Sequence, residues 1–190
     1  MPTYNLDSFV TECRDVMSLD GDPVDRVELL VPAMYRLLNG DTGFLKPEHF
    51  KSDPDHYARN AIHIEEDDAF SLYALVWSPG QWTPIHDHGT WGVVGVYEGA
   101  LHEKSYFRTD SAGVISKSGI DLARGGIIVL APGAVTSFVP NPDHIHLTGN
   151  PDQEKRIVSL HLYGSAMAGF NVYDRPAQTR KWIEVSYNES

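Results

Sequence analysis

The sequence is poor in cysteine, in long apolar runs and in positive charge. Its single cysteine, Cys13, excludes a disulfide within the chain and favours a reducing compartment. The chain has no apolar run long enough to span a bilayer. Residues 1–5 lack the basic and apolar regions that mark a signal peptide. We therefore expect a cytoplasmic protein.

The shortage of positive charge also limits the expected partners. The chain holds 15 Lys and Arg residues against 26 Asp and Glu residues, which gives a net charge of -11. This charge would repel nucleic acid and anionic membranes, so we expect neither as a partner. A chain of 190 residues that is 42% hydrophobic can bury its own core. We expect a single domain over residues 1–190, as a monomer or a small homo-oligomer.

Residues 1–50 have the apolar spacing of helices. Asn5 or Asp7 can cap a first helix, and Asp22 can cap a second. Pro32 lies inside the second apolar pattern and predicts a kink or a break there. We expect this helical segment to pack on the remainder of the chain.

After residue 57 the apolar pattern alternates, as in strands. Turn signals such as Pro132-Gly133 and Asn141-Pro142-Asp143 separate the runs. Many short strands predict an all-β barrel or sandwich, with a barrel core over residues 57–165 and a C-terminal extension over 166–190. The candidate strands are Ala58–Glu65, Phe70–Trp77, Thr83–His88, Gly92–Tyr106, Ser118–Leu122, Gly126–Leu130, Thr136–Pro140, His144–Gly149 and Ile157–Tyr163.

Two histidines in the stretch GQWTPIHDHGTWGVVGVYEG (residues 80–99) are separated by one residue. Alternate residues of a strand face the same side, so the imidazoles of His86 and His88 are expected to share one space. Imidazole is a suitable ligand for iron, zinc, copper and nickel. The spacing therefore suggests a metal site, although two histidines exposed between turns would show the same pattern.

The other histidines differ in their sequence context. His146 lies between apolar residues on a predicted strand, and His144 could share its face or be exposed next to a turn. His49 and His56 lie in a charged loop and are expected on the surface.

A third pattern combines a hydroxyl, an imidazole and a phenol. Ser159, His161 and Tyr163 alternate with apolar residues, which places them together on one face of a strand. That face is either exposed to solvent or part of an interior hydrogen-bond chain.

Two of these spacings together resemble the motifs of the cupin superfamily. Gly80-x5-His86-x-His88 resembles the first motif, and His146-x3-Asn150 resembles the second. Gly92 stands where the first motif normally has a glutamate ligand, so a three-histidine site is implied. Three-histidine cupins with a Ser-x-His-x-Tyr strand resemble the cysteine dioxygenase family of thiol dioxygenases. The implied fold is an all-β double-stranded β-helix, the cupin or jelly-roll barrel, with an N-terminal α-helical segment.

The resemblance implies a role for each matching residue. Residues 57–60 resemble the Tyr-x-Arg-Asn segment of the family, whose arginine binds the substrate carboxylate, so Tyr57 and Arg59 are the substrate-binding candidates. The implied Fe(II) ligands are His86, His88 and His146. The implied outer-shell triad is Ser159, His161 and Tyr163, with the Tyr163 hydroxyl directed at the iron.

The sequence departs from the animal members of that family at two places. Those enzymes have, just after the paired histidines, a cysteine that crosslinks to the active-site tyrosine. Here the region is Gly92-Val93, so no crosslink is expected. The Ser-Pro-Pro that follows their tyrosine is here Gly164-Ser165-Ala166.

The implied reaction adds both atoms of O2 to the sulfur of a small thiol, most simply L-cysteine, to give a sulfinic acid. Three neutral imidazoles leave metal positions free for a thiolate and O2. Arg59 offers a planar fork to a carboxylate and favours L-cysteine over 3-mercaptopropionate, whose dioxygenases tend to lack this arginine. Another thiol carboxylate, a cupin isomerase or hydrolase using zinc, manganese or nickel, and a non-catalytic metal-binding cupin are the alternatives.

Overall fold

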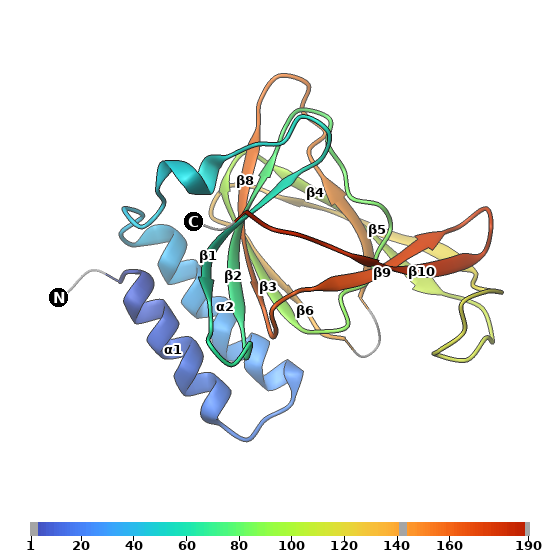
Figure 1. Ribbon diagram of the computed structural model, residues 1–190, viewed down its shortest axis with the longest axis horizontal. Helices are drawn as coiled ribbons and strands as arrows, with labels where there is room; N and C mark the ends of the chain where they lie inside the picture. Colours follow the sequence, from blue (N-terminus) through green and yellow to red (C-terminus); the bar gives the residue numbers. More distant parts are fainter. Residues whose placement is uncertain (1–3, 141–143, 189–190) are drawn as a thin grey trace.

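A computed structural model describes residues 4–140 and 144–188 of the chain. They form two α-helices, one short 3-10 helix and ten strands (Figure 1). The helices are α1 (Leu6–Ser18), α2 (Pro23–Asn39) and η1 (Pro47–Phe50). The strands are β1 (Ala58–Ile64), β2 (Ser71–Trp77), β3 (Gly92–Glu98), β4 (Leu101–Arg108), β5 (Leu122–Leu130), β6 (Val135–Phe138), β7 (Ile145–Gly149), β8 (Ile157–Tyr163), β9 (Gly169–Asp174) and β10 (Thr179–Glu184).

The largest sheet has five strands in the order β1-β2-β8-β3-β6. Helices α1 and α2 lie side by side against one face of it (Figure 1). Leu160 and Leu162 of β8 pack toward these helices, whereas Tyr163 on the same strand packs into the other core. The alternation of β8 therefore separates an apolar face under the helices from a polar face that looks into the barrel.

A three-stranded sheet in the order β5-β4-β7 and the β9–β10 hairpin complete the fold. All strand pairs of the three sheets are antiparallel. Single bridges connect the segment before β3 to β7 and to β9, at His86–His146 and His86–Val172. The chain is thus an all-β double-stranded β-helix with an N-terminal helical segment, as predicted.

The helical prediction is correct except at one residue. Asn5 caps α1, and Asp22 caps α2 with a capping box. Pro32, which predicted a kink or a break, lies inside a continuous α2. Proline removes one backbone hydrogen bond there, but the buried Leu30, Met34 and Leu37 hold the helix on the sheet.

Four of the predicted strands do not match the observed elements. Residues 83–88 form single bridges instead of a strand, and Pro84 among them has no N–H to donate. The predicted strand Gly92–Tyr106 is the β3–β4 hairpin, which reverses at Gly99, where φ is 80°. The predicted strand Ser118–Leu122 contributes only Leu122 to β5, which continues without a break through the predicted strand Gly126–Leu130. Within β5, Gly125 admits the close approach of Ser105 at a register shift.

The structure also bears on the expectations for His49 and for the C-terminal extension. His49, predicted on the surface, is the buried residue of η1, and its carbonyl accepts a hydrogen bond from Asn60. The C-terminal extension supplies β9 and β10, a complete hairpin. The expected turn at residues 141–143 lies outside the described residues. In the described chain, neither helix has the length and apolar character needed to cross a membrane.

Candidate metal centre and active site

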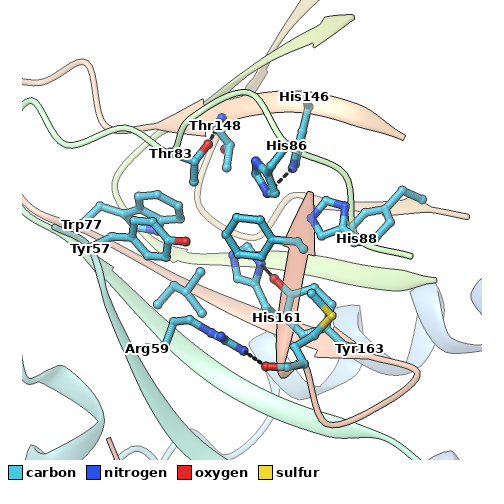
Figure 2. Close-up of a pocket in the computed structure, with 14 residues that line it drawn as sticks. Tyr57, Arg59, Trp77, Thr83, His86, His88, His146, Thr148, His161 and Tyr163 are labelled. Carbon is cyan, nitrogen blue, oxygen red and sulfur yellow. Dashed lines mark hydrogen bonds between the residues drawn. The ribbon is translucent and has the colours of Figure 1, made fainter. Parts of the chain in front are cut away.

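A pocket opens on the inner face of the five-stranded sheet (Figure 2). Seven of the eight residues predicted for the site line it: Tyr57, Arg59, His86, His88, His146, His161 and Tyr163. The eighth, Ser159, lies behind His161 and is fully buried. The structure therefore brings all eight predicted residues to one place.

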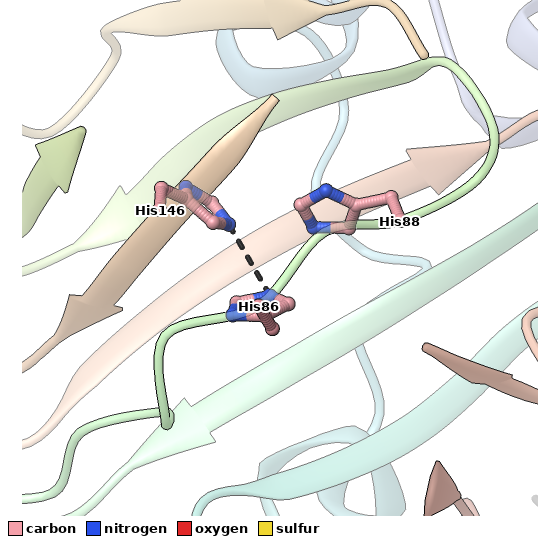
Figure 3. Close-up of side chains that lie close together, drawn as sticks. All are labelled: His86, His88 and His146. Atoms are coloured by element: carbon pink, nitrogen blue, oxygen red, sulfur yellow. Dashed lines mark hydrogen bonds between the residues drawn. The ribbon is translucent and has the colours of Figure 1, made fainter. Parts of the chain in front are cut away.

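Three histidines converge at one side of the pocket (Figure 3). Each of His86, His88 and His146 offers a ring nitrogen, and these atoms lie within 4.8 Å of one another. The Nε2 atoms of His86 and His146 are 3.2 Å apart. Such a set of three imidazoles could hold a metal ion.

The backbone explains why these side chains meet. His86 and His146 exchange two backbone hydrogen bonds of 2.9 Å each, so their side chains leave the barrel wall at the same level. His88 lies two residues further, and its ring stacks on Phe138 of β6 at a centroid distance of 4.1 Å. The co-facing of the two paired histidines is therefore achieved without a regular strand.

The hydrogen bonds of the rings fit metal binding. Nδ1 of His86 lies 3.0 Å from the carbonyl oxygen of Pro84, and Nδ1 of His146 lies 3.2 Å from a carboxylate oxygen of Glu103. Both acceptors require a hydrogen on Nδ1, so both Nε2 atoms carry lone pairs. Two lone pairs that face each other at 3.2 Å repel unless a cation lies between them. The residues present therefore fit a metal ion.

Electrostatics also favours neutral ligands. Burial lowers the pKa of His86, His88 and His146, and the neighbouring imidazoles add to the effect. Burial alone would raise the pKa of Glu103, but hydrogen bonds from His144 and His146 outweigh it and lower the pKa. A negative carboxylate thus lies directly behind a neutral imidazole.

A hydrogen-bond chain runs along β8 on the opposite side of the pocket. The Trp77 indole donates to Ser159 Oγ at 2.9 Å. Ser159 Oγ lies 2.9 Å from His161 Nε2, and His161 Nδ1 lies 3.1 Å from the Tyr163 hydroxyl oxygen. Burial lowers the pKa of His161 to about 3 and raises that of Tyr163. The imidazole is therefore neutral and the phenol is protonated.

Arg59 contributes a buried positive charge to the pocket. Its NH2 donates to the Met167 carbonyl at 3.3 Å, and its guanidinium lies 4.7 Å from the centre of the Tyr73 ring. Its NH1 has no hydrogen-bond partner, and no carboxylate of the described residues forms an ion pair with it. Beside it, Tyr57 stacks on Trp77 at a centroid distance of 4.6 Å. The pocket is therefore suited to an anionic group.

Three residues important to this geometry were not found by the sequence analysis: Trp77, Asp87 and Glu103. Each acts through a partner from a distant part of the chain, so no local spacing marks it. Asp87 is the clearest case. It lies between the paired histidines and points the other way, where its buried carboxylate accepts hydrogen bonds from Asn171 and Tyr173.

Comparison with known proteins finds one family and several solved structures that are similar to this chain. The family model of cysteine dioxygenase type I matches residues 24–176. Among solved structures, a Klebsiella pneumoniae protein with a double-stranded β-helix domain is 15% identical, with 70% of this chain and 99% of that chain covered and a TM-score of 0.48. A cupin-2 domain from Rhodospirillum rubrum is 11% identical, with 67% and 74% covered and a TM-score of 0.46.

Proposed function

The chain belongs to the cysteine dioxygenase type I family, and from this premise we propose that it is a non-haem Fe(II) thiol dioxygenase acting on L-cysteine. The reaction adds both oxygen atoms of O2 to the thiol sulfur, which is oxidised to a sulfinic acid while O2 is reduced. One observation supports a carboxylated substrate above all. The buried Arg59 has a free NH1 and no acidic partner among the described residues, in the same pocket as the three histidines.

The proposed ligands are His86, His88 and His146. Bound Fe(II) would supply the redox chemistry that joins O2 to a thiolate, and three neutral protein ligands leave positions free for both. The Pro84 carbonyl and the Glu103 carboxylate hold the Nδ1 atoms of His86 and His146, so the Nε2 atoms of these two rings would be the ones to bind the ion.

Arg59 orients the substrate in this proposal. A guanidinium binds a carboxylate through two parallel hydrogen bonds, which fixes direction as well as distance. The Met167 carbonyl accepts from NH2, and the buried NH1, which has no partner, is left for the substrate carboxylate. Leaving this cation unpaired in the interior is costly, and a bound carboxylate would remove that cost.

Tyr163 has a hydroxyl hydrogen available to the pocket in this proposal. Ser159 accepts from Trp77, and in the described part of the chain the acceptor for its own hydrogen is His161 Nε2. His161 then carries its hydrogen on Nδ1 and donates to the Tyr163 oxygen. The phenolic hydrogen is therefore free to form a hydrogen bond with a reacting oxygen or the substrate. The hydrogen bonds from Trp77 to His161 keep the Tyr163 hydroxyl in place.

Oxygen consumption by iron-loaded protein tests the proposal. We expect uptake with L-cysteine, with one sulfinate formed for each O2, and much weaker uptake with cysteamine, which has no carboxylate. A preference for 3-mercaptopropionate would overturn the choice of substrate but not the reaction. No uptake with any of these thiols, despite bound iron, would overturn the proposed reaction.

A further inference from the structure

The proposed site has no carboxylate ligand at the position where the cupin motif has one, but a carboxylate lies behind one of the three histidines. Position 92 is glycine, and a Cβ there would lie 2.4 Å from Cζ of Phe138. A side chain at this position would displace the ring that stacks on His88. A buried carboxylate does contact one proposed ligand: Oε2 of Glu103 on β4 lies 3.2 Å from the outer nitrogen, Nδ1, of His146.

We propose that Glu103 is a positioning residue that, held by His144, acts through His146 to set the affinity and the reduction potential of the metal centre. This role rests on the proposed metal ligands. Glu103 and His144 would tune the metal centre without themselves contacting the substrate or the metal.

Both carboxylate oxygens of Glu103 contact histidines. Its side chain is 7% exposed, with Oε2 lying 3.2 Å from His146 Nδ1 and Oε1 lying 3.1 Å from His144 Nε2. No lysine or arginine of the described residues pairs with it. The whole charge of the carboxylate is therefore directed at the two imidazoles, and only one of these is a proposed ligand.

The three ligands then differ in donor strength. His86 is oriented by a neutral carbonyl, that of Pro84, and His88 Nδ1 is buried with no partner. His146 alone has a carboxylate behind it. A carboxylate that accepts the Nδ1 hydrogen increases the electron density at Nε2, so His146 is expected to be the strongest donor. A stronger donor stabilises the more highly charged ion and so lowers the reduction potential.

His144 holds the orientation of the Glu103 carboxylate. It occupies Oε1, so Oε2 is left to His146, and its side chain is 26% exposed, at the solvent side of the cluster. Its loss would free the carboxylate to rotate or to take up water, without removing a proposed metal ligand. Substitution of His144 should therefore alter metal binding through Glu103.

The test compares Glu103→Gln with Glu98→Gln, a matched control at the exposed end of β3 that pairs with Arg156. The amide preserves size and removes the charge. The dissociation constant is measured by chelator competition with Fe(II) and with Zn2+, the reduction potential by titration of the iron-loaded protein, and the melting temperature without metal. Glu103→Gln is expected to bind either metal about 10- to 100-fold more weakly and to have a more positive potential. The control should match the wild type.

His144→Ala and His144→Gln extend the test if Glu103→Gln does not fold. The alanine variant should weaken metal binding in the same direction, and the glutamine variant, whose amide can donate to Oε1, should restore it. Wild-type affinity and potential in both Glu103→Gln and His144→Ala would overturn the inference. The proposed function fails separately, if the wild type binds iron but consumes no O2 with any thiol.

Discussion

At the residue scale, the charge of Arg59 makes the most direct prediction about substrate choice. Arg59→Ala removes the guanidinium from the pocket but leaves the histidines untouched. KM for L-cysteine should rise by about 10- to 100-fold, since a charge-assisted hydrogen bond contributes about 1.5–3 kcal/mol. Steady-state oxygen uptake with L-cysteine and with cysteamine measures the effect, and KM for cysteamine should change little.

The matched control is Arg156→Ala, which removes an arginine that is half-exposed and pairs with Glu98 on the surface. It should behave like the wild type with both thiols. An equal rise in KM for L-cysteine and cysteamine in Arg59→Ala would show that the arginine does not bind the carboxylate.

Single residues also show what the sequence could and could not predict. Alternation placed Ser159, His161 and Tyr163 on one face, and the structure joins them by hydrogen bonds as an interior chain. Glu103 and Trp77 could not be found in this way. Their partners are 43 or more positions away or on another strand, and only the folded barrel brings them together.

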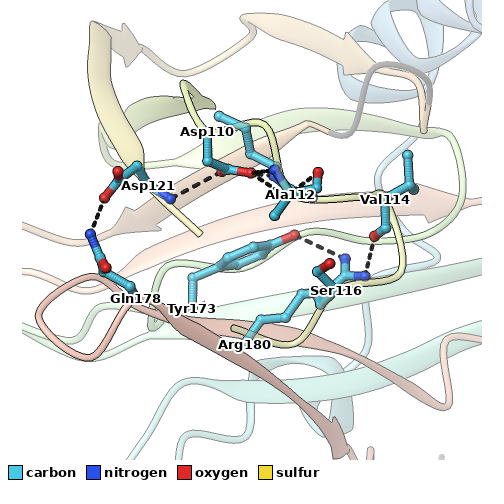
Figure 4. Close-up of polar contacts among 9 residues, drawn as sticks. Asp110, Ala112, Val114, Ser116, Asp121, Tyr173, Gln178 and Arg180 are labelled. Carbon is cyan, nitrogen blue, oxygen red and sulfur yellow. Dashed lines mark hydrogen bonds and ion pairs between the residues drawn. The ribbon is translucent and has the colours of Figure 1, made fainter. Parts of the chain in front are cut away.

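At the element scale, the β9–β10 hairpin supports the segment that carries the paired histidines. Asn171 and Tyr173 of β9 hold the Asp87 carboxylate, with the Tyr173 hydroxyl at 2.7 Å. Arg180 of β10 lies 3.9 Å from the same carboxylate. It also donates to the carbonyls of Ser116 and Val114 in the loop between β4 and β5 (Figure 4). The hairpin therefore connects the β4–β5 loop to Asp87, the residue between two proposed ligands.

Asp87→Asn tests this support. The amide keeps the size of the side chain but turns a donor toward the N–H and O–H groups that now donate to it. We expect the free energy of unfolding of the metal-free protein to fall by about 3 kcal/mol, because a buried charged acceptor is lost. Urea denaturation measures it.

Asp121→Asn is the control on the outer side of the hairpin, where Asp121 accepts a hydrogen bond from Gln178 (Figure 4). This exposed contact should be worth no more than about 1 kcal/mol. If Asp87→Asn unfolds at the wild-type urea concentration, the hairpin does not support the histidine segment.

Elements could be predicted from the sequence where a single pattern decides them. The predicted β8, Ile157–Tyr163, has the observed bounds, because its alternation is unbroken. Residues 83–88 are more polar and form single bridges to two different strands. The sequence pattern cannot reveal that one short segment is shared between β7 and β9, so the strand was predicted there in error.

At the scale of the whole molecule, the proposed ligands link two parts of the barrel. His86 and His88 precede β3 of the five-stranded sheet, whereas His146 belongs to β7 of the three-stranded sheet. A metal ion that binds all three would therefore add a side-chain link between this segment and β7, beside the backbone bridge at His86–His146. Such an ion binds the folded chain and not the unfolded one, so it should stabilise the protein as a whole.

Metal removal gives the corresponding prediction. At a free metal concentration of about 100 times the dissociation constant, binding adds about 2.7 kcal/mol to the free energy of unfolding. For a chain of this size, that corresponds to a melting temperature higher by roughly 5–10 °C with metal than with chelator. Thermal unfolding with and without Fe(II), under anaerobic conditions, measures the shift. His86→Ala should abolish the shift, whereas His56→Ala, which alters an exposed imidazole, should preserve it. A full shift in His86→Ala would mean that the stabilising ion binds elsewhere, because the two remaining imidazoles, those of His88 and His146, could not hold it as tightly.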